Sequence, residues 1–223
     1  MIYIFFTVTL KPTNRTWGPN SDTDVVDRIN RYWRCIHNSM EYLKEFEIKP
    51  VILINDKDIT NSPLDKLKEY YSNLDVLYTN NNIENIDNKA KCELETILYG
   101  MEYFKVKDDD IIIKQTGRYL TCDPGPTYFY KQVVDGQNNF DCIGKFYNIA
   151  TGEFIYNTLT LGLFAMRVKY LKKFQYRIVT ICSAEVEFGE YIRTYIPENR
   201  TQELAQLNIE FCPANNPNIL GYA

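Results

Sequence analysis

The amino-acid sequence predicts an α/β fold with a mostly parallel central sheet, Rossmann-like in its first part, and helices on both faces. Short apolar segments rich in β-branched residues recur along residues 1–119, as expected of buried strands. Segments with apolar residues three or four positions apart lie between them, which is typical of amphipathic helices. The connections have the length that right-handed crossovers between parallel strands require. The first part is therefore expected to follow the order βαβαβαβ.

The elements of this first part follow from the apolar pattern. Strands are expected at residues 2–10, 50–55, 74–78 and 111–113. A long helix should begin at Asp22 or Asp24 and continue to residue 43, and another should cover residues 89–104. Ser62-Pro63 should begin a short helix, because serine caps helices and proline suits the first helical position.

Beyond residue 119 the pattern predicts a smaller part that is no longer a regular strand–helix alternation. Helices are expected at residues 127–134 and 164–174, and strands at residues 140–146 and 156–163. Ser183 should cap a final helix. The residues from Pro197 onward are expected to form an irregular tail.

Composition limits the class of protein. The chain has 223 residues, 45% apolar and 24% charged, with a net charge of −4, so it is globular and has no basic surface for nucleic acid or anionic membranes. No repeat or linker divides it, and we expect one domain over residues 1–223, with a nucleotide-binding half at 1–119 and an acceptor-side half at 120–223. The apolar start is too short for a transmembrane segment and lacks a basic flank. A cytoplasmic protein is expected.

Cysteine and histidine exclude several kinds of site. None of the cysteines forms a Cys-x-x-Cys pair, which predicts free thiols in a reducing compartment; they stand at positions 35, 92, 122, 142, 182 and 212. His37 is the only histidine of the sequence, which argues against histidine-based catalysis. The Gly-x-Gly-x-x-Gly and P-loop patterns are absent from the sequence, which disfavours dinucleotide dehydrogenases and P-loop enzymes.

Residues 108–119 contain the strongest functional signal. Three aspartates precede an Ile-Ile-Ile run, and Lys114, Thr116, Gly117, Arg118 and Tyr119 follow it within six residues. A buried strand that ends in cations places positive charge at the carboxyl edge of the sheet, where α/β proteins bind ligands. The stretch is interpreted as an anion-binding edge, with phosphate as the anion. The alternative is a central strand followed by an ordinary polar loop.

Other acidic and basic positions are weaker candidates. Asp56 and Asp58 form an Asp-x-Asp after the second predicted strand, a pair that can bind Mg²⁺ or Mn²⁺. Asp109 is a third possible metal ligand, and no metal site is assigned firmly. Asp56 by itself could bind a base or ribose. Arg15, in the loop after the first strand, could contact a nucleotide.

Two motifs together resemble those of a known family. The segment Asn88-Lys89 with Glu93-Leu94-Glu95 precedes Lys114-Gln115-Thr116-Gly117-Arg118-Tyr119. This combination resembles small sugar-nucleotide glycosyltransferases of bacterial polysaccharide loci and large DNA viruses of algae, which typically carry Lys-Gly-x-x-Glu and then Lys-x-Thr-Gly-Arg-Tyr. Residues 161–167 and 184–192 are also similar to family segments. Ala90 departs from the family glycine, and the motif stands where such enzymes usually carry a metal-binding Asp-x-Asp.

The resemblance implies a single GT-A-like domain that transfers a hexosyl or deoxyhexosyl group from a UDP-, GDP- or dTDP-sugar to a glycan or other hydroxyl acceptor. Lys114 and Arg118 would stabilise the departing diphosphate, with Mg²⁺ or Mn²⁺ as an open alternative. Glu185 is the first candidate for the general base and Glu187 the second. Thr7, Lys91 and Glu95 complete the set of donor-binding candidates.

Two other classes stay open at this stage. A nucleotidyltransferase or other nucleotide-processing enzyme would also need phosphate-binding cations, together with carboxylates clustered on metal ions. A non-catalytic carbohydrate-binding module is compatible with the 18 tyrosines and 12 phenylalanines. The Asn-, Ile-, Lys- and Tyr-rich composition fits an AT-rich genome, such as that of a giant algal virus.

Overall fold

The first part of the chain builds the parallel strands. The computed structural model describes residues 1–11, 22–56, 59–79, 89–121, 126–147, 155–177, 183–211 and 221–222. Its first strands are β1 (Ile2–Val8), β2 (Ile48–Ile54), β3 (Asp75–Tyr78) and β4 (Ile111–Thr116). The helices between them are α1 (Asp22–Leu43), a 3₁₀ turn at Pro63–Lys66 that leads into α2 (Leu67–Tyr70), and α3 (Lys89–Tyr103). The predicted βαβαβαβ order is confirmed.

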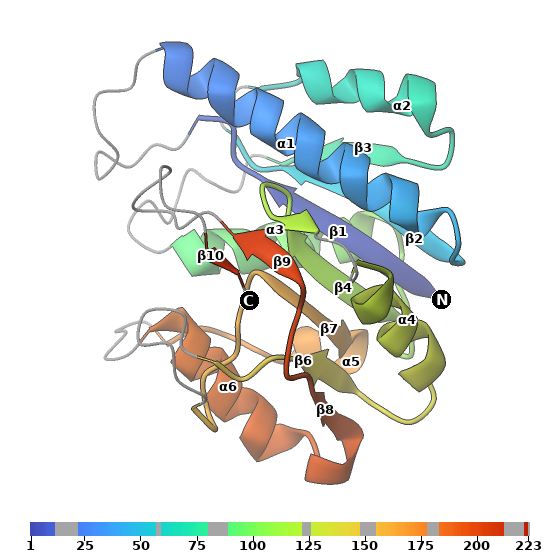
Figure 1. Ribbon diagram of the computed structural model, residues 1–223. Helices are drawn as coiled ribbons and strands as arrows, with labels where there is room; N and C mark the ends of the chain where they lie inside the picture. Colours follow the sequence, from blue (N-terminus) through green and yellow to red (C-terminus); the bar gives the residue numbers. More distant parts are fainter. Residues whose placement is uncertain are drawn as a thin grey trace.

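The second part adds antiparallel strands. Its elements are β5 (Leu120–Thr121), α4 (Pro126–Gly136), β6 (Cys142–Gly144), β7 (Leu163–Arg167), α5 (Val168–Leu171), α6 (Ala184–Tyr195), a 3₁₀ turn at Glu198–Arg200, β8 (Thr201–Glu203), β9 (Ile209–Phe211) and β10 (Gly221–Tyr222). A seven-stranded sheet has the order β3-β2-β1-β4-β7-β6-β8 (Figure 1), and β10, β9 and β5 form a small second sheet.

Strand register determines which ends of the strands meet. Ile2 of β1 lies opposite Ile48 of β2 on one side and Ile111 of β4 on the other, in parallel pairs. The carboxyl ends of these strands therefore meet at one edge of the sheet. Strand β7 is antiparallel to β4, and β6 is antiparallel to β7. Strand β6 consequently runs in the direction of β4 and ends at the same edge.

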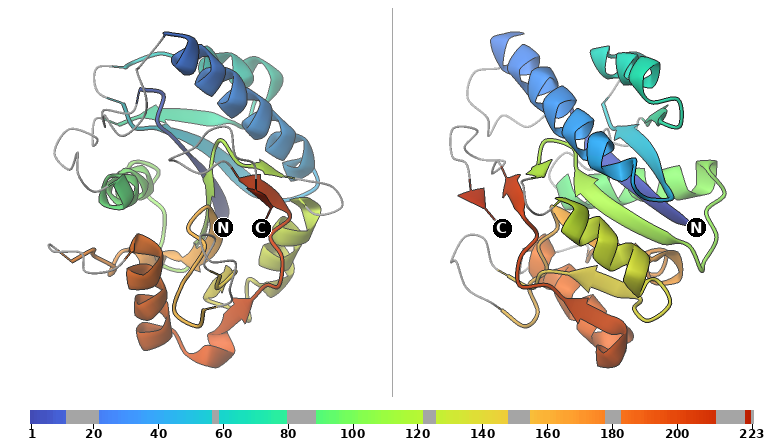
Figure 2. Two further views of the ribbon diagram at one scale, coloured as in Figure 1. Left: turned by 60° about the vertical axis from the view of Figure 1, so that its left-hand side comes forward. Right: turned by 45° about the vertical axis from the view of Figure 1, so that its right-hand side comes forward.

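Helices cover both faces of this sheet, as predicted. Alternate residues of β1 enter different clusters: Phe6 packs with Ile36 of α1, whereas Phe5 packs with Ile97 of α3 and Phe188 of α6. Figure 2 shows α1 and α4 on one side of the sheet and α3 and α6 on the other. Because both faces are buried, the central strands are continuous apolar runs.

Several elements differ from the prediction. The strand expected at residues 156–163 and the helix expected at 164–174 are wrong: β7 covers Leu163–Arg167, and only Val168–Leu171 is helical. This apolar run is buried on both faces, so its sequence carries neither a strand nor a helix period. The expected irregular tail contains β8 and β9, and Lys114 to Thr116 extend β4 rather than forming a loop.

Smaller predictions of the sequence are confirmed where the structure describes them. Ser62 and Ser183 cap their helices through hydrogen bonds to Leu64 N and Val186 N. Cys35, Cys92 and Cys142 are buried thiols, whereas positions 122, 182 and 212 lie outside the described residues. None of the helices in the described ranges is both long and apolar enough to cross a bilayer.

A buried carboxylate joins the antiparallel strands. Asp141 accepts hydrogen bonds from Arg167 Nε at 2.8 Å and from Arg200 Nη2 at 2.8 Å, and Lys169 Nζ lies 3.9 Å away. Burial raises the pKa of Asp141, but the hydrogen bonds from Arg200 and Arg167 and the charge of Lys169 outweigh it, and the pKa lies below its usual value. Asp141, which lies directly before β6, therefore holds together the end of β7 and the turn before β8 through these two arginines.

Replacing Asp141 with Asn should lower the free energy of unfolding by about 3 kcal/mol, because it leaves buried cations without their counter-charge. The contribution of the wild-type carboxylate is present above the unfolded-state pKa of about 3.9 and is lost as the pH falls through the lower folded-state pKa. Urea unfolding at pH 7 and across the acid range measures both effects.

The matched control is Asp135→Asn, which removes an exposed carboxylate paired with Lys131, where both side chains are more than half exposed. It should change the free energy of unfolding by less than about 0.5 kcal/mol. Equal effects of the two substitutions would contradict a structural role for Asp141.

Candidate functional site

The carboxyl edge of the parallel strands collects most of the candidate residues. Strands β1, β2 and β4 end there, and helices α3 and α6 begin on that side of the molecule, at the left in Figure 1. Ligands of open α/β sheets bind at this edge.

Lys114 of β4 is the centre of a buried polar cluster. Its side chain is only 2% exposed, and Nζ donates to Thr116 Oγ1 at 2.9 Å and to Leu161 O at 2.6 Å. Glu93 Oε1 lies 3.0 Å from Nζ and also accepts from Thr7 Oγ1 at 2.6 Å. These contacts use the donors of the ammonium group and match its charge. Lys114 thus lies at the carboxyl end of a buried strand, as the sequence predicts, and not in the polar loop of the alternative interpretation.

Glu93 is a site residue that the sequence reasoning missed. It lies in the first turns of α3, within the segment that resembles the family motif. The prediction chose Lys91 and Glu95 from this segment, and these two side chains form an ion pair with each other at 3.9 Å and are partly exposed. The helical period alone could not identify Glu93. Whether this residue, between the buried Cys92 and Leu94, turns toward β1 and β4 depends on which face of α3 meets the sheet.

The two glycines at this edge allow close packing within the protein. Gly117 N donates to Thr7 O at 3.0 Å, and a Cβ at this position would lie 3.0 Å from Val8 and 3.1 Å from Tyr32. Gly117 therefore allows the chain to approach β1 and α1, whereas the sequence had suggested approach to a ligand. The Gly162 carbonyl accepts a hydrogen bond from Thr116 N, and a Cβ at Gly162 would lie 1.9 Å from the Tyr119 ring.

Arg118 lies in the turn after β4. Its carbonyl accepts hydrogen bonds from Arg31 Nε at 3.2 Å and from Cys35 Sγ at 3.2 Å, so α1 holds this turn in place. The side chain is partly exposed. Arg15, the other predicted cation, lies outside the described residues.

Two of the three aspartates proposed for a metal, Asp56 and Asp109, lie at opposite edges of the sheet. Asp56 is buried after β2 and accepts from Leu10 N at 2.6 Å and Lys11 N at 2.7 Å; burial raises its pKa. Asp109 is exposed before β4, at the opposite edge of the sheet. Asp58 lies outside the described residues. In the part of the chain that the structure describes, no group of three or more His, Cys, Asp or Glu side chains could hold a metal ion.

The first turn of α6 carries the carboxylates proposed as bases. Glu187 is 3% exposed; Oε1 accepts from Arg177 N, and the Arg177 guanidinium Nε lies 3.9 Å away. Oε2 is buried and has no hydrogen-bond partner among the described residues. Glu185 is only partly buried, and its carbonyl accepts from Leu159 N at 3.1 Å. A buried carboxylate oxygen without a donor is rare in folded proteins and marks Glu187 as the stronger of the two candidates.

Tyr176 joins the two groups of carboxylates. Burial raises its pKa well above the ordinary value, and the charges of Glu93, Glu185 and Glu187 raise it further. Its hydroxyl is therefore neutral and lies within electrostatic reach of α3 and α6 together. Tyr176 was not among the predicted site residues. Nothing in the sequence indicates that its hydroxyl lies within electrostatic range of Glu93 and Glu187.

Lys145 is a second buried lysine near this edge. It follows β6, which runs in the direction of β4, and its side chain lies over the Tyr147 ring at 4.2 Å. Desolvation lowers its pKa. Lys145 was expected within the strand at residues 140–146 and was not among the predicted site residues.

Replacing Gly162 with Ala should displace Tyr119 and destabilise the protein by about 1–3 kcal/mol, as overpacking does. Urea unfolding of Gly162→Ala, Tyr119→Ala and the double variant measures the free energy of unfolding of each. The double variant should be less destabilised than the sum of the single variants, because removal of the ring makes room for the new methyl group. Strict additivity would contradict this contact.

Comparisons with known proteins support the fold. A protein described as a nucleotide-diphospho-sugar transferase from Desulfovibrio desulfuricans G20 is similar, with a TM-score of 0.53, 11% identity, and coverage of 91% of this chain and 78% of that chain. S. aureus TarS has a TM-score of 0.53 and 14% identity over 94% of this chain, which spans 59% of the solved TarS chain. The third is 4-diphosphocytidyl-2C-methyl-D-erythritol synthase, with a TM-score of 0.51, 9% identity, and coverage of 93% and 91%.

No protein-family model matches the sequence, and no curated protein matches it. Identities this low establish a shared fold and no more. The predicted single-domain, GT-A-like α/β fold is thereby confirmed.

Proposed function

We propose that this protein is a glycosyltransferase that moves a sugar from a nucleotide-diphosphate sugar to a hydroxyl group of an acceptor. The observation that carries the proposal is the buried carboxylate of Glu187, with an oxygen that no described residue engages, on the same side of the sheet as the Lys114–Glu93 cluster. The GT-A-like fold supports it, since a neighbour with this fold is described as a nucleotide-diphospho-sugar transferase.

Departure of a nucleotide diphosphate develops negative charge, which the protein must stabilise. Arg118 is proposed as the cation that contacts the diphosphate, and Lys114 as a fixed positive charge behind it. Glu93, Thr7 and Thr116 would position Lys114. Among the described residues no three His, Cys, Asp or Glu side chains gather to hold a metal ion, so the proposal assigns this charge stabilisation to Arg118 and Lys114.

Transfer also requires a base for the acceptor hydroxyl. Glu187 is proposed for this role, with Glu185 as the alternative that the sequence ranked first. The hydroxyl proton passes to the carboxylate, the acceptor oxygen bonds to the anomeric carbon, and the bond from that carbon to the diphosphate oxygen breaks. Asp56 is still proposed to contact a base or ribose. Its oxygens accept hydrogen bonds from the backbone N–H groups of Leu10 and Lys11, just after β1.

A panel of UDP-, GDP- and dTDP-sugars, read by thermal shift and by product analysis, tests the function. At least one donor should raise the melting temperature and yield a glycosylated acceptor with release of the nucleoside diphosphate. Release of pyrophosphate from a nucleoside triphosphate would instead favour the nucleotidyltransferase alternative. Absence of a shift with every donor would reject the glycosyltransferase.

Replacing Glu187 with Gln should abolish sugar transfer, because an amide cannot accept the proton, while the donor-induced thermal shift persists. Glu185→Gln should transfer sugar at a rate close to wild type. Glu198→Gln, at an exposed position after α6, is the matched control. Normal transfer by Glu187→Gln, or loss of transfer in Glu185→Gln alone, would contradict the assignment of the base.

Arg118→Ala should weaken binding of a nucleoside diphosphate about 10–100-fold, the loss expected for about 1.5–3 kcal/mol of charge-assisted hydrogen bonding. Binding of the corresponding nucleoside, which has no phosphate, should not change. Calorimetric titration measures both ligands. Arg34→Ala removes an exposed arginine of α1 and should leave both affinities unchanged; an equal effect on nucleoside and diphosphate would make Arg118 structural.

A further inference from the structure

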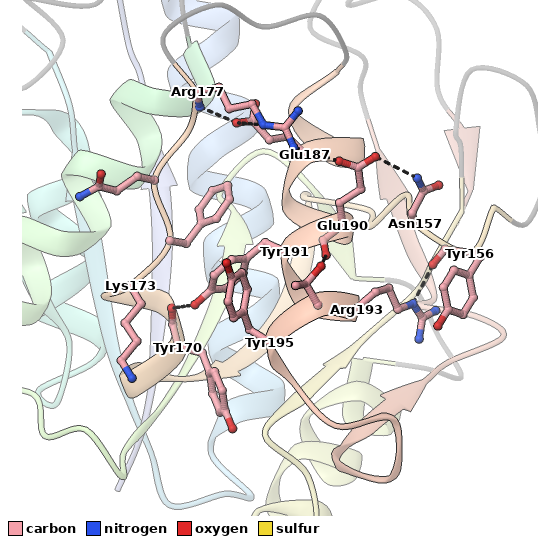
Figure 3. Close-up of a pocket in the computed structure, with 13 residues that line it drawn as sticks. Tyr156, Asn157, Tyr170, Lys173, Arg177, Glu187, Glu190, Tyr191, Arg193 and Tyr195 are labelled. Atoms are coloured by element: carbon pink, nitrogen blue, oxygen red, sulfur yellow. Dashed lines mark hydrogen bonds and ion pairs between the residues drawn. The ribbon is translucent and has the colours of Figure 1, made fainter.

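A hollow of about 840 Å³ follows helix α6. Its walls come from α6, from residues 170–177, and from Tyr156 and Asn157 (Figure 3). The volume lies within the range of small-molecule sites, about 300–1,000 Å³. Glu187 lies at its border. The side chain proposed as the base therefore forms part of the wall of the hollow.

Four tyrosines line the hollow. Tyr191 and Tyr195 stand one helical turn apart, with ring centroids separated by 4.9 Å, and Tyr191 Oη donates to Tyr170 O at 2.7 Å. Tyr195 is 63% exposed and Tyr156 is 65% exposed. Such rings offer an apolar face together with a hydroxyl group. The C–H face of a pyranose ring has the shape and polarity that pack on them.

The charges of the walls are largely matched within the protein. Arg177 lies 3.3 Å from Glu190 Oε2 and 3.9 Å from Glu187 Oε1. Arg193 lies over the Phe146 ring at 3.8 Å and the Tyr156 ring at 4.1 Å. Lys173, the remaining cation of the lining, lies well away from Glu187 in Figure 3. Arg193 also pairs with Glu203 at 2.5 Å. Because the arginines near Glu187 are already paired with carboxylates of the protein, the hollow favours an uncharged, hydroxyl-rich ligand over an anion.

We propose that this hollow binds the acceptor, and that the acceptor is an uncharged saccharide whose ring packs on Tyr195 and Tyr191 and whose hydroxyl group faces Glu187. The transfer step rests on the proposed function, whereas binding of the saccharide does not. Two observations point to a ligand independently: the exposed tyrosines of a formed hollow, and the buried Glu187 Oε2 without a partner among the described residues.

Saturation-transfer NMR on the full chain tests binding, with methyl glycosides of glucose, galactose, mannose and rhamnose as uncharged probes and glucuronic acid as the anionic probe. At least one uncharged probe should receive saturation from the wild-type protein. Tyr195→Ala should weaken its binding about tenfold, which corresponds to about 1.4 kcal/mol. Because Tyr195 is largely exposed, its removal should leave the melting temperature nearly unchanged.

Tyr103→Ala is the matched control. Tyr103 is 61% exposed on α3 and packs on Phe104 with centroids 5.0 Å apart, which reproduces the exposure and ring contact of Tyr195 outside the hollow. This variant should bind the probe like wild type. The proposal is overturned by absence of saturation with every uncharged probe, by preference for glucuronic acid, or by equal effects of the two variants. Saccharide binding without any response to nucleotide sugars would keep this site and reject the glycosyltransferase.

Discussion

The burial of one ammonium group determines much of the geometry of the sheet edge. Lys114 lies in the middle of the sheet with 2% of its side chain exposed, where a charge without a partner would be very unfavourable. The buried ammonium group is compatible with folding because the carboxylate of Glu93 balances its charge, and because Thr116 Oγ1 and Leu161 O accept hydrogen bonds from its other N–H groups. These partners belong to α3, β4 and the segment before β7. The cation therefore holds three parts of the chain at one point, and Thr7 adds β1 through Glu93.

The neighbouring contacts reinforce this arrangement. Gln115, the residue after Lys114, is fully buried and faces the other side of the sheet, where it accepts from Tyr130 Oη at 2.7 Å and donates to Ser39 Oγ at 2.9 Å. Two successive residues of β4 thus connect the sheet to α3 on one face and to α1 and α4 on the other. A polar network of this kind is rigid only when each member has its partner. The turn that carries Arg118 begins directly after β4. The network that holds β4 in place therefore also determines where this turn lies.

The proposed functional surface extends from this edge toward the hollow beside α6. Tyr176 lies within reach of carboxylates from α3 and α6, and it connects the Lys114 cluster to the first turn of α6. Beyond Glu187 the walls consist of tyrosines and of ion pairs that are partly exposed. A donor with a diphosphate requires fixed charge, whereas a saccharide requires flat apolar faces and hydroxyl groups. The Lys114 cluster offers the fixed charge, and the walls beyond Glu187 offer the apolar faces and hydroxyl groups.

The sequence by itself determined the parallel part of the fold, because local patterns decide it. The apolar run of β4, the period of α1 and the serine caps at 62 and 183 depend on neighbours within a few residues, and all are found where they were expected. The run at 163–167 was misassigned because a segment buried on both faces has no period. Only the surrounding strands β4 and β6 make it a strand.

The tertiary structure alone decided what each charged residue contacts. Lys114 and Arg118 could be recognised as an unusual pair of cations after a buried strand, but nothing in the sequence paired Lys114 with Glu93, which is 21 positions earlier. Glu93 was not chosen over Lys91 and Glu95 for the same reason: the face of α3 that meets the sheet depends on packing. Likewise, Gly117 and Gly162 were needed for contacts with Val8 and Tyr119. Such contacts join distant segments, and only the folded chain brings them within bonding distance.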